Sequence, residues 1–273
     1  MRNIYICFPE GKHKVVTMSY DDGRVADRRL VSIFNKNGIK GTFHLNAGLM
    51  ERGDHITADE AKELYVGHEI SCHTFTHPTI ARCPNELIIQ QVMEDRKKLE
   101  DIAGYPVRGL SYPNGSHDKR IRELLPFCGI EYSRTVGGTG GYSIPEDFLA
   151  WTATCHHRDC MKYAQAFVEL HKRQYLYMLY VWGHSYEFDN NNNWELIEQF
   201  CEFIGKRDDI WYATNIEIVD YLKACNNLKY SASCDFVYNP SVQTVWLEVD
   251  GKIVEVKGGT QVNFNTLEQS EVK

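Results

Sequence analysis

Two pairs of polar residues in this sequence have the types and spacing to bind a divalent metal and to activate water. Asp21 and Asp22 end an apolar run at residues 15–18, and His73 and His77 follow a second short apolar run further along the chain. One carboxylate and two imidazoles can hold a divalent ion, which leaves the other carboxylate beside it to accept a proton. These residues therefore predict metal-assisted hydrolysis of an amide or an ester.

Composition limits the kind of protein that carries these residues. The chain has 273 residues, of which 43% are hydrophobic, so it can bury a large core, and its length is ordinary for a single α/β barrel. A net charge of −7 argues against nucleic-acid binding, which would need a basic stripe. No apolar stretch reaches the length of a membrane span. We expect a soluble enzyme with no nucleic-acid or membrane partner.

The cysteines and the start of the chain bear on localisation. Nine cysteines are an odd number, and they match neither a disulfide framework nor a zinc finger. The first residues lack the long apolar segment and cleavage site of a secretory leader. We therefore expect a cytoplasmic protein with reduced thiols, and a trimmed secreted chain is the alternative.

Strand and helix signals alternate from residue 13 to about residue 224, which predicts parallel strands with helices outside them. Capping boxes begin two of the helices, at Thr57 and Thr214. The number of units indicates a barrel, complete or incomplete. The predicted strands cover residues 15–19, 39–45, 68–72, 107–112, 130–134, 175–182 and 210–213, and the predicted helices cover 26–37, 57–66, 86–102, 119–126, 161–173, 194–204 and 214–225.

The pattern changes after the barrel, which we assign to residues 1–225. Short alternating runs fill residues 230–264, with turn signals at 239–240, 250–251 and 258–259. Residues 226–273 therefore predict a small β-rich extension that packs on the barrel.

At the residues described above, the chain resembles the polysaccharide deacetylase family, the NodB-like enzymes of carbohydrate esterase family 4. The resemblance covers roughly residues 13–222 and extends to Pro113-Asn114-Gly115 and Trp182-Gly183-His184. It implies a distorted, TIM-like (β/α)7 barrel that removes N- or O-linked acetyl groups from a carbohydrate with a divalent metal. Two histidines and a carboxylate suit zinc, with cobalt, nickel, manganese or iron as alternatives.

The resemblance also implies roles for individual residues. It makes Asp21 the base, and it makes Asp22, His73 and His77 the metal ligands. A histidine across the site is the natural proton donor to the leaving atom, and His184 follows an apolar strand that should end at the same rim. The residues expected to contact the substrate or to stabilise the oxyanion are Asn114, Tyr112 and Trp182.

Two departures from the family pattern indicate altered supporting residues. Ser111 stands where relatives often have an arginine that tethers the catalytic aspartate, and Arg108 lies nearby but out of register. The motif whose aspartate orients the acid histidine in relatives is replaced by residues 151–157. We expect His156, His157 or Glu187 to provide that orientation instead.

Three functions remain open from the sequence. The first is a metal-dependent carbohydrate deacetylase. The second is a hydrolase of the same fold that acts on small non-sugar amides, which the missing arginine and the altered motif would fit. The third is a non-catalytic carbohydrate-binding relative. The sequence leaves the sugar, the metal and the oligomeric state undetermined.

Overall fold

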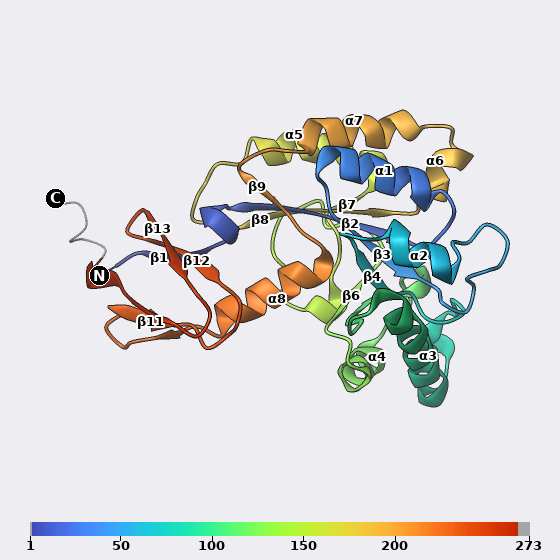
Figure 1. Ribbon diagram of the computed structural model, residues 1–273, viewed down its shortest axis with the longest axis horizontal. Helices are drawn as coiled ribbons and strands as arrows, with labels where there is room; N and C mark the ends of the chain where they lie inside the picture. The colour runs from blue at the N-terminus through green and yellow to red at the C-terminus, as the bar shows by residue number, and fades with distance from the viewer. Residues whose placement is uncertain (1, 267–273) are drawn as a thin grey trace.

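The computed structural model describes residues 2–266 and contains a curled parallel sheet of eight strands (Figure 1). The sheet order is β6-β5-β4-β3-β2-β8-β7, and β9 pairs with the first part of β2. The strands are β2 (Lys14–Asp21), β3 (Gly41–Leu45), β4 (Glu69–Cys72), β5 (Gly109–Ser111), β6 (Tyr132–Arg134), β7 (Cys155–His156), β8 (Tyr177–Gly183) and β9 (Ile210–Tyr212). All neighbouring pairs are parallel, so their carboxyl ends share one rim.

An irregular segment spans the two edges of this sheet. The Trp151 backbone N–H donates to Ser133 of β6, and the Thr154 N–H donates to Tyr180 of β8. The segment then becomes β7, which pairs with β8. This arrangement is a distorted barrel, and it confirms the predicted fold class.

The described residues form eight α-helices. They are α1 (Asp27–Asn37), α2 (Ala58–Leu64), α3 (Asn85–Ala103), α4 (Lys119–Leu124), α5 (Cys160–Val168), α6 (Tyr186–Asn190), α7 (Trp194–Ile204) and α8 (Asn215–Asn226). Figure 1 shows α1, α5 and α7 along one side of the sheet and α3 and α4 along another. The helix after Thr214 has the complete predicted capping box. In the described residues no helix has the length and apolar character needed to cross a membrane.

The elements differ from the sequence predictions in several places, among them the short helix α6, which was not predicted. The helix predicted over 161–173 ends at Val168, because residues 171–175 are exposed and offer no apolar face to pack. The strand β7 was not predicted, since only two residues of the segment pair with β8 and the sequence there has no alternation.

The β-rich extension contains two three-stranded antiparallel sheets, β1-β12-β13 and β10-β11-β14. Their strands are β1 (Ile4–Cys7), β10 (Lys229–Tyr230), β11 (Phe236–Tyr238), β12 (Val245–Val249), β13 (Lys252–Val256) and β14 (Gln261–Asn263). The N-terminal strand β1 pairs with β12, so it lies with the extension although the boundary at residue 225 assigns it to the barrel. Buried Val245 and Leu247 of the extension join one apolar cluster with Phe8 and Tyr221, which packs the extension on the barrel.

A buried carboxylate fastens strands β3, β4 and β6 to helix α8. Glu69 accepts hydrogen bonds from the Thr42 hydroxyl at 2.9 Å, the Tyr132 hydroxyl at 2.7 Å and the Ile216 backbone N–H at 3.0 Å. Burial raises the pKa of Glu69 to about 7, although these hydrogen bonds oppose the shift. The fold therefore favours the protonated form of this side chain near neutral pH.

The raised pKa of Glu69 predicts how stability depends on pH. The pKa of Glu69 is higher in the fold than in the unfolded chain. The contribution of Glu69 to the free energy of unfolding is therefore greatest at low pH and is lost as the pH rises to about 7. We expect Glu69→Gln, measured by urea denaturation, to gain stability relative to the native chain between pH 5 and pH 8, by up to roughly 3 kcal/mol. The exposed Glu63→Gln should show no such gain, and equal behaviour of the two variants would contradict the prediction.

Candidate metal and acid–base site

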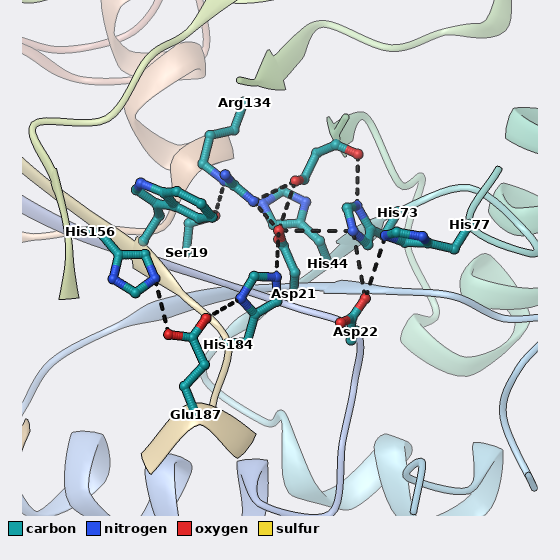
Figure 2. Close-up of polar contacts among 12 residues, drawn as sticks. Ser19, Asp21, Asp22, His44, His73, His77, Arg134, His156, His184 and Glu187 are labelled. Atoms are coloured by element: carbon teal, nitrogen blue, oxygen red, sulfur yellow. Dashed lines mark hydrogen bonds and ion pairs between the residues drawn. The ribbon is translucent and has the colours of Figure 1, made fainter. Parts of the chain in front are cut away.

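The predicted site residues meet at the carboxyl-end rim of the parallel strands (Figure 2). Asp21 is the last residue of β2, Ser111 ends β5 and Arg134 ends β6. His73 directly follows β4, and His184 directly follows β8. Residues far apart in the sequence are adjacent here because parallel strands bring their carboxyl ends to one edge, where barrel sites are built.

Asp22, His73 and His77 form a set of three potential metal ligands. Their ligand atoms all lie within 4.8 Å of one another, and Asp22 Oδ1 is 3.6 Å from His73 Nε2 and 3.8 Å from His77 Nε2. Ligands bonded at about 2.0–2.2 Å to a tetrahedral ion are separated by roughly 3.3–3.6 Å, so a small closure would fit zinc. The other nitrogen of His73 lies 2.8 Å from the Ser111 carbonyl oxygen, which fixes the ring so that Nε2 faces Asp22.

The backbone around these ligands has several left-handed residues. Asp22, Thr74, His77 and Asn114 have φ values of 77°, 64°, 59° and 56°. This conformation is uncommon for residues with a Cβ and is found preferentially at functional sites. Here it turns the chain sharply at the strand ends and directs Asp22 and His77 toward His73.

The buried carboxylate of Asp21 is tethered by Arg134, which the sequence analysis did not identify. The Arg134 Nη2 atom donates to Asp21 Oδ2 and, at 2.5 Å, to the Ser111 hydroxyl. The Ser111 hydroxyl itself donates to Asp21 Oδ2 at 3.2 Å. An arginine from β6 therefore makes the contact expected of an arginine at position 111, and the smaller Ser111 leaves room for it.

Arg134 is itself held on several sides. It is fully buried, and it donates from Nε to the Ser19 hydroxyl and from Nη1 to the Thr135 carbonyl oxygen. Its guanidinium lies 4.5 Å from the ring centre of Trp182, close enough for a cation–π contact. A guanidinium fixed in this way can hold Asp21 in one orientation.

The charge of Asp21 follows from its neighbours. Burial alone would raise its pKa, but the Arg134 guanidinium, with smaller effects from His73, His44 and His184, holds the pKa of Asp21 well below its usual range. Asp21 is therefore an anion, 3.8 Å from His73 Nε2 and 3.9 Å from His184 Nε2. It lies between the ligand set and the predicted acid.

Glu187 orients His184. Its Oε1 atom lies 2.6 Å from His184 Nδ1, while its Oε2 atom lies 3.3 Å from the Nε2 atoms of both His156 and His157. Burial would lower the pKa of His184, but the hydrogen bond to Glu187 and the nearby Asp21 raise it. Because Glu187 accepts the proton on Nδ1, the Nε2 atom of His184 is the one directed at Asp21.

Three further buried residues support the site, and the sequence analysis assigned none of them a role in holding it. Asp95 of α3 accepts hydrogen bonds from the backbone N–H groups of Ala47 and His73, at 2.7 and 3.0 Å. Asp27 of α1 accepts from the Ser185 hydroxyl, beside His184. His44, fully buried, lies 3.2 Å from the Cys72 carbonyl oxygen, and burial lowers its pKa to about 3, so it is neutral. Their only sequence signal is a polar residue within an otherwise apolar face.

The residues predicted to contact substrate are placed unequally. Trp182 lines a cavity of about 420 Å³ together with His156, His184 and Glu187. Asn114 is exposed at the rim, and its side chain donates to Thr79. Tyr112 does not face the site, because its ring is buried and its hydroxyl donates to the Leu149 carbonyl oxygen. The prediction of a substrate contact for Tyr112 is therefore wrong for this structure.

The rim of this curled parallel barrel carries an Asp-His-His set with an adjacent Asp and His, which are the side chains that metal-assisted hydrolysis would need. Residues 9–133 match the family model described as polysaccharide deacetylase. The chain is 28% identical over 115 residues to chitin deacetylase 1 of Cryptococcus neoformans var. grubii, which covers 41% of this chain and 24% of that protein. It is 23% identical over 135 residues to the peptidoglycan-N-acetylglucosamine deacetylase PgdA of Listeria monocytogenes, covering 46% and 27%.

The similarity extends to the whole barrel in three dimensions. A Mycobacterium smegmatis protein of the polysaccharide deacetylase family superimposes with a TM-score of 0.63 at 16% identity, covering 81% of this chain and 94% of that one. Residues 9–133 thus resemble the polysaccharide deacetylase family over slightly less than half of the chain, and the barrel fold is that of the M. smegmatis protein. It spans about a quarter of the length of the curated relatives that it matches.

The Arg134–Asp21 contact predicts a strong thermodynamic coupling. Arg134→Met would leave a buried carboxylate without its cation, which costs about 3–5 kcal/mol in the free energy of unfolding. In the Asp21→Asn background the same change should cost much less, because no buried charge remains. Urea denaturation of the metal-free proteins in a double-mutant cycle measures the difference.

A second arginine provides the control for this cycle. Arg108 pairs with Asp220 at 2.6 Å in a partly exposed position, so Arg108→Met should cost no more than about 1 kcal/mol. Additive effects of Arg134→Met and Asp21→Asn would show that the pair does not constrain Asp21.

Proposed function

We propose that this chain is a divalent-metal-dependent hydrolase that removes N- or O-linked acetyl groups from a carbohydrate. The observation that carries the proposal is the position of Asp21, which lies within 4 Å of both His73 in the ligand set and His184. A base beside a metal site with an acid across from it is the arrangement that acyl hydrolysis needs.

Asp22, His73 and His77 would hold the metal. A bound divalent ion supplies a Lewis acid that polarises the acetyl carbonyl and favours ionisation of water at neutral pH. The residues fit such an ion because three ligand atoms converge and the His73 ring is fixed from behind by the Ser111 carbonyl. Zinc suits this donor set, and cobalt, nickel, manganese and iron are alternatives.

The chain's own residues would move the protons. Asp21, held anionic by Arg134, accepts a proton from the attacking water. The backbone N–H of Asn114, at the rim, stabilises the negative charge that develops on the carbonyl oxygen. His184 then donates the proton on Nε2 to the leaving nitrogen or oxygen, while Glu187 holds Nδ1. Trp182, in the cavity wall beside His184, would contact the acetyl methyl group.

The relatives support a carbohydrate substrate. The matched proteins are a chitin deacetylase and a peptidoglycan N-acetylglucosamine deacetylase, and both names describe an N-acetylated sugar. The hydrolase of small amides was a separate possibility because of the missing arginine and the altered motif. Arg134 now contacts Asp21 and Glu187 contacts His184, so neither reason favours the small-amide hydrolase over the deacetylase. A non-catalytic relative would have no need for the retained base, acid and ligand set.

Acetate release from a panel of N- and O-acetylated saccharides tests the proposal. The metal-stripped protein, reloaded with zinc, cobalt or nickel, should release acetate from at least one member. Asp21→Asn should lower the rate by about 10²–10⁴-fold, the usual contribution of a general base. Full activity of Asp21→Asn, or no release with any metal while metal still binds, would reject the mechanism.

Glu187 should set the alkaline limit of activity. It raises the pKa of His184, so Glu187→Gln should lower that pKa and deprotonate the acid at a lower pH. The falling limb of the kcat–pH profile should therefore shift toward acid, with activity lost first at high pH. Exposed Glu63→Gln serves as the control. An unshifted alkaline limb in Glu187→Gln would mean that Glu187 does not act through His184.

A further inference from the structure

A second cluster of potential metal ligands lies beside the first. His156 at the end of β7, His157 and Glu187 of α6 have ligand atoms that all lie within 4.8 Å of one another. The Nε2 atoms of His156 and His157 each lie 3.3 Å from Glu187 Oε2. Figure 2 shows the His156 ring directed at the Glu187 carboxylate, on the side of His184 away from Asp22. Three donors from two neighbouring segments thus converge on one point.

The distances in this cluster suit a metal ion. Donors bonded at about 2.0–2.2 Å to a tetrahedral ion are roughly 3.3–3.6 Å apart, and the two measured separations agree with the lower end. Both separations lie within this range, whereas in the Asp22–His73–His77 set one separation is 3.6 Å and the other, at 3.8 Å, lies outside it. Imidazole and carboxylate together are donors that zinc and similar divalent ions prefer.

The surroundings of the cluster would restrict the ligands while leaving one side open. The His157 side chain is 3% exposed, packed between Tyr20 and Phe188, and its Nδ1 atom has no hydrogen-bond partner. Its Nε2 is thus the nitrogen aimed at the cluster. His156 and Glu187 also line the cavity of about 420 Å³, which provides space for a fourth ligand.

A third cluster of the described residues has similar donor types but does not fit as well. Cys7, His13 and Glu248 also have ligand atoms within 4.8 Å of one another. However, Arg173 Nη2 lies 3.1 Å from Glu248 Oε2, so a guanidinium already occupies the carboxylate and would repel a cation. The basic side chain next to the His156 cluster, Arg158, has its Nε atom 3.6 Å from Asp159 instead.

We propose that His156, His157 and Glu187 form a second divalent-cation site, which binds zinc or a similar divalent ion. Glu187 Oε2 would bind the ion while Oε1 keeps its hydrogen bond with His184 Nδ1. One carboxylate then connects the second site to the predicted acid. A carboxylate bound to a cation is a weaker hydrogen-bond acceptor, so filling this site should loosen the hold of Glu187 on His184 and lower activity, and this consequence alone rests on the proposed function.

Metal stoichiometry tests the site without reference to activity. The full chain is stripped of metal, dialysed against micromolar zinc and analysed for protein-bound metal. The native chain should bind one ion at each of the two sets. His157→Phe, which preserves the packing against Phe188, should bind one ion fewer, and so should His77→Gln. The variant with both substitutions should bind none.

Two controls keep the result interpretable. His156→Asn, on the more open side of the cluster, should behave like His157→Phe, and circular dichroism shows whether each variant is folded. His171→Ala changes an exposed histidine outside both sets and should leave the stoichiometry unchanged. A native chain that binds a single ion, or cluster variants that retain the native stoichiometry, would overturn the proposal.

An activity measurement separates this inference from the proposed function. If the chain is a deacetylase, the native chain with both sets filled should have a kcat several-fold lower than His156→Asn with an ion at the Asp22–His73–His77 set alone. Two bound ions with no acetate release would reject the proposed function while leaving the second site intact. One bound ion with full activity would reject the second site and leave the proposed function intact.

Discussion

A buried negative charge on Asp21 is the constraint around which the rim of this barrel is built. A carboxylate removed from water is costly unless a cation pairs with it, and here the partners of Asp21 converge on its Oδ2 atom. Arg134 supplies the charge, and it can reach only because the sheet curls enough to bring the end of β6 across to the end of β2. Ser19, Ser111 and Trp182 contact the same guanidinium, so the pair fixes the positions of four strand ends.

The residues around the site show that a supporting contact can be supplied from a new place in the chain. The tether of Asp21 comes from β6 instead of from the end of β5, and the partner of His184 lies three residues after it. What the chemistry requires is a charge at a given point, so the residue that provides it can change while the ligands and the base remain.

The sequence predicted most elements and the ligand set, because these depend on local patterns. Alternating strands and helices follow from hydrophobic period, and Asp21, Asp22, His73 and His77 lie directly after strands whose ends must meet. Arg134 could not be predicted in the same way. Its role depends on the curl of the sheet. In the sequence alone, an arginine at the end of a strand cannot be distinguished from a solvent-exposed arginine. The prediction of a substrate contact for Tyr112 was wrong because a side chain next to the site in sequence can still point into the core.

The pairing of β1 with β12 has a consequence for how the chain is assembled. Ile4 lies opposite Val249, so β1 can pair with β12 only after the whole barrel between them has been synthesised. Contacts between such distant segments carry a large entropic cost of closure and form slowly. The parallel barrel can acquire its strand order before this event. The pairing of β1 with β12 would then be a late step in folding, and until it occurs β1 remains an unpaired edge open to other chains.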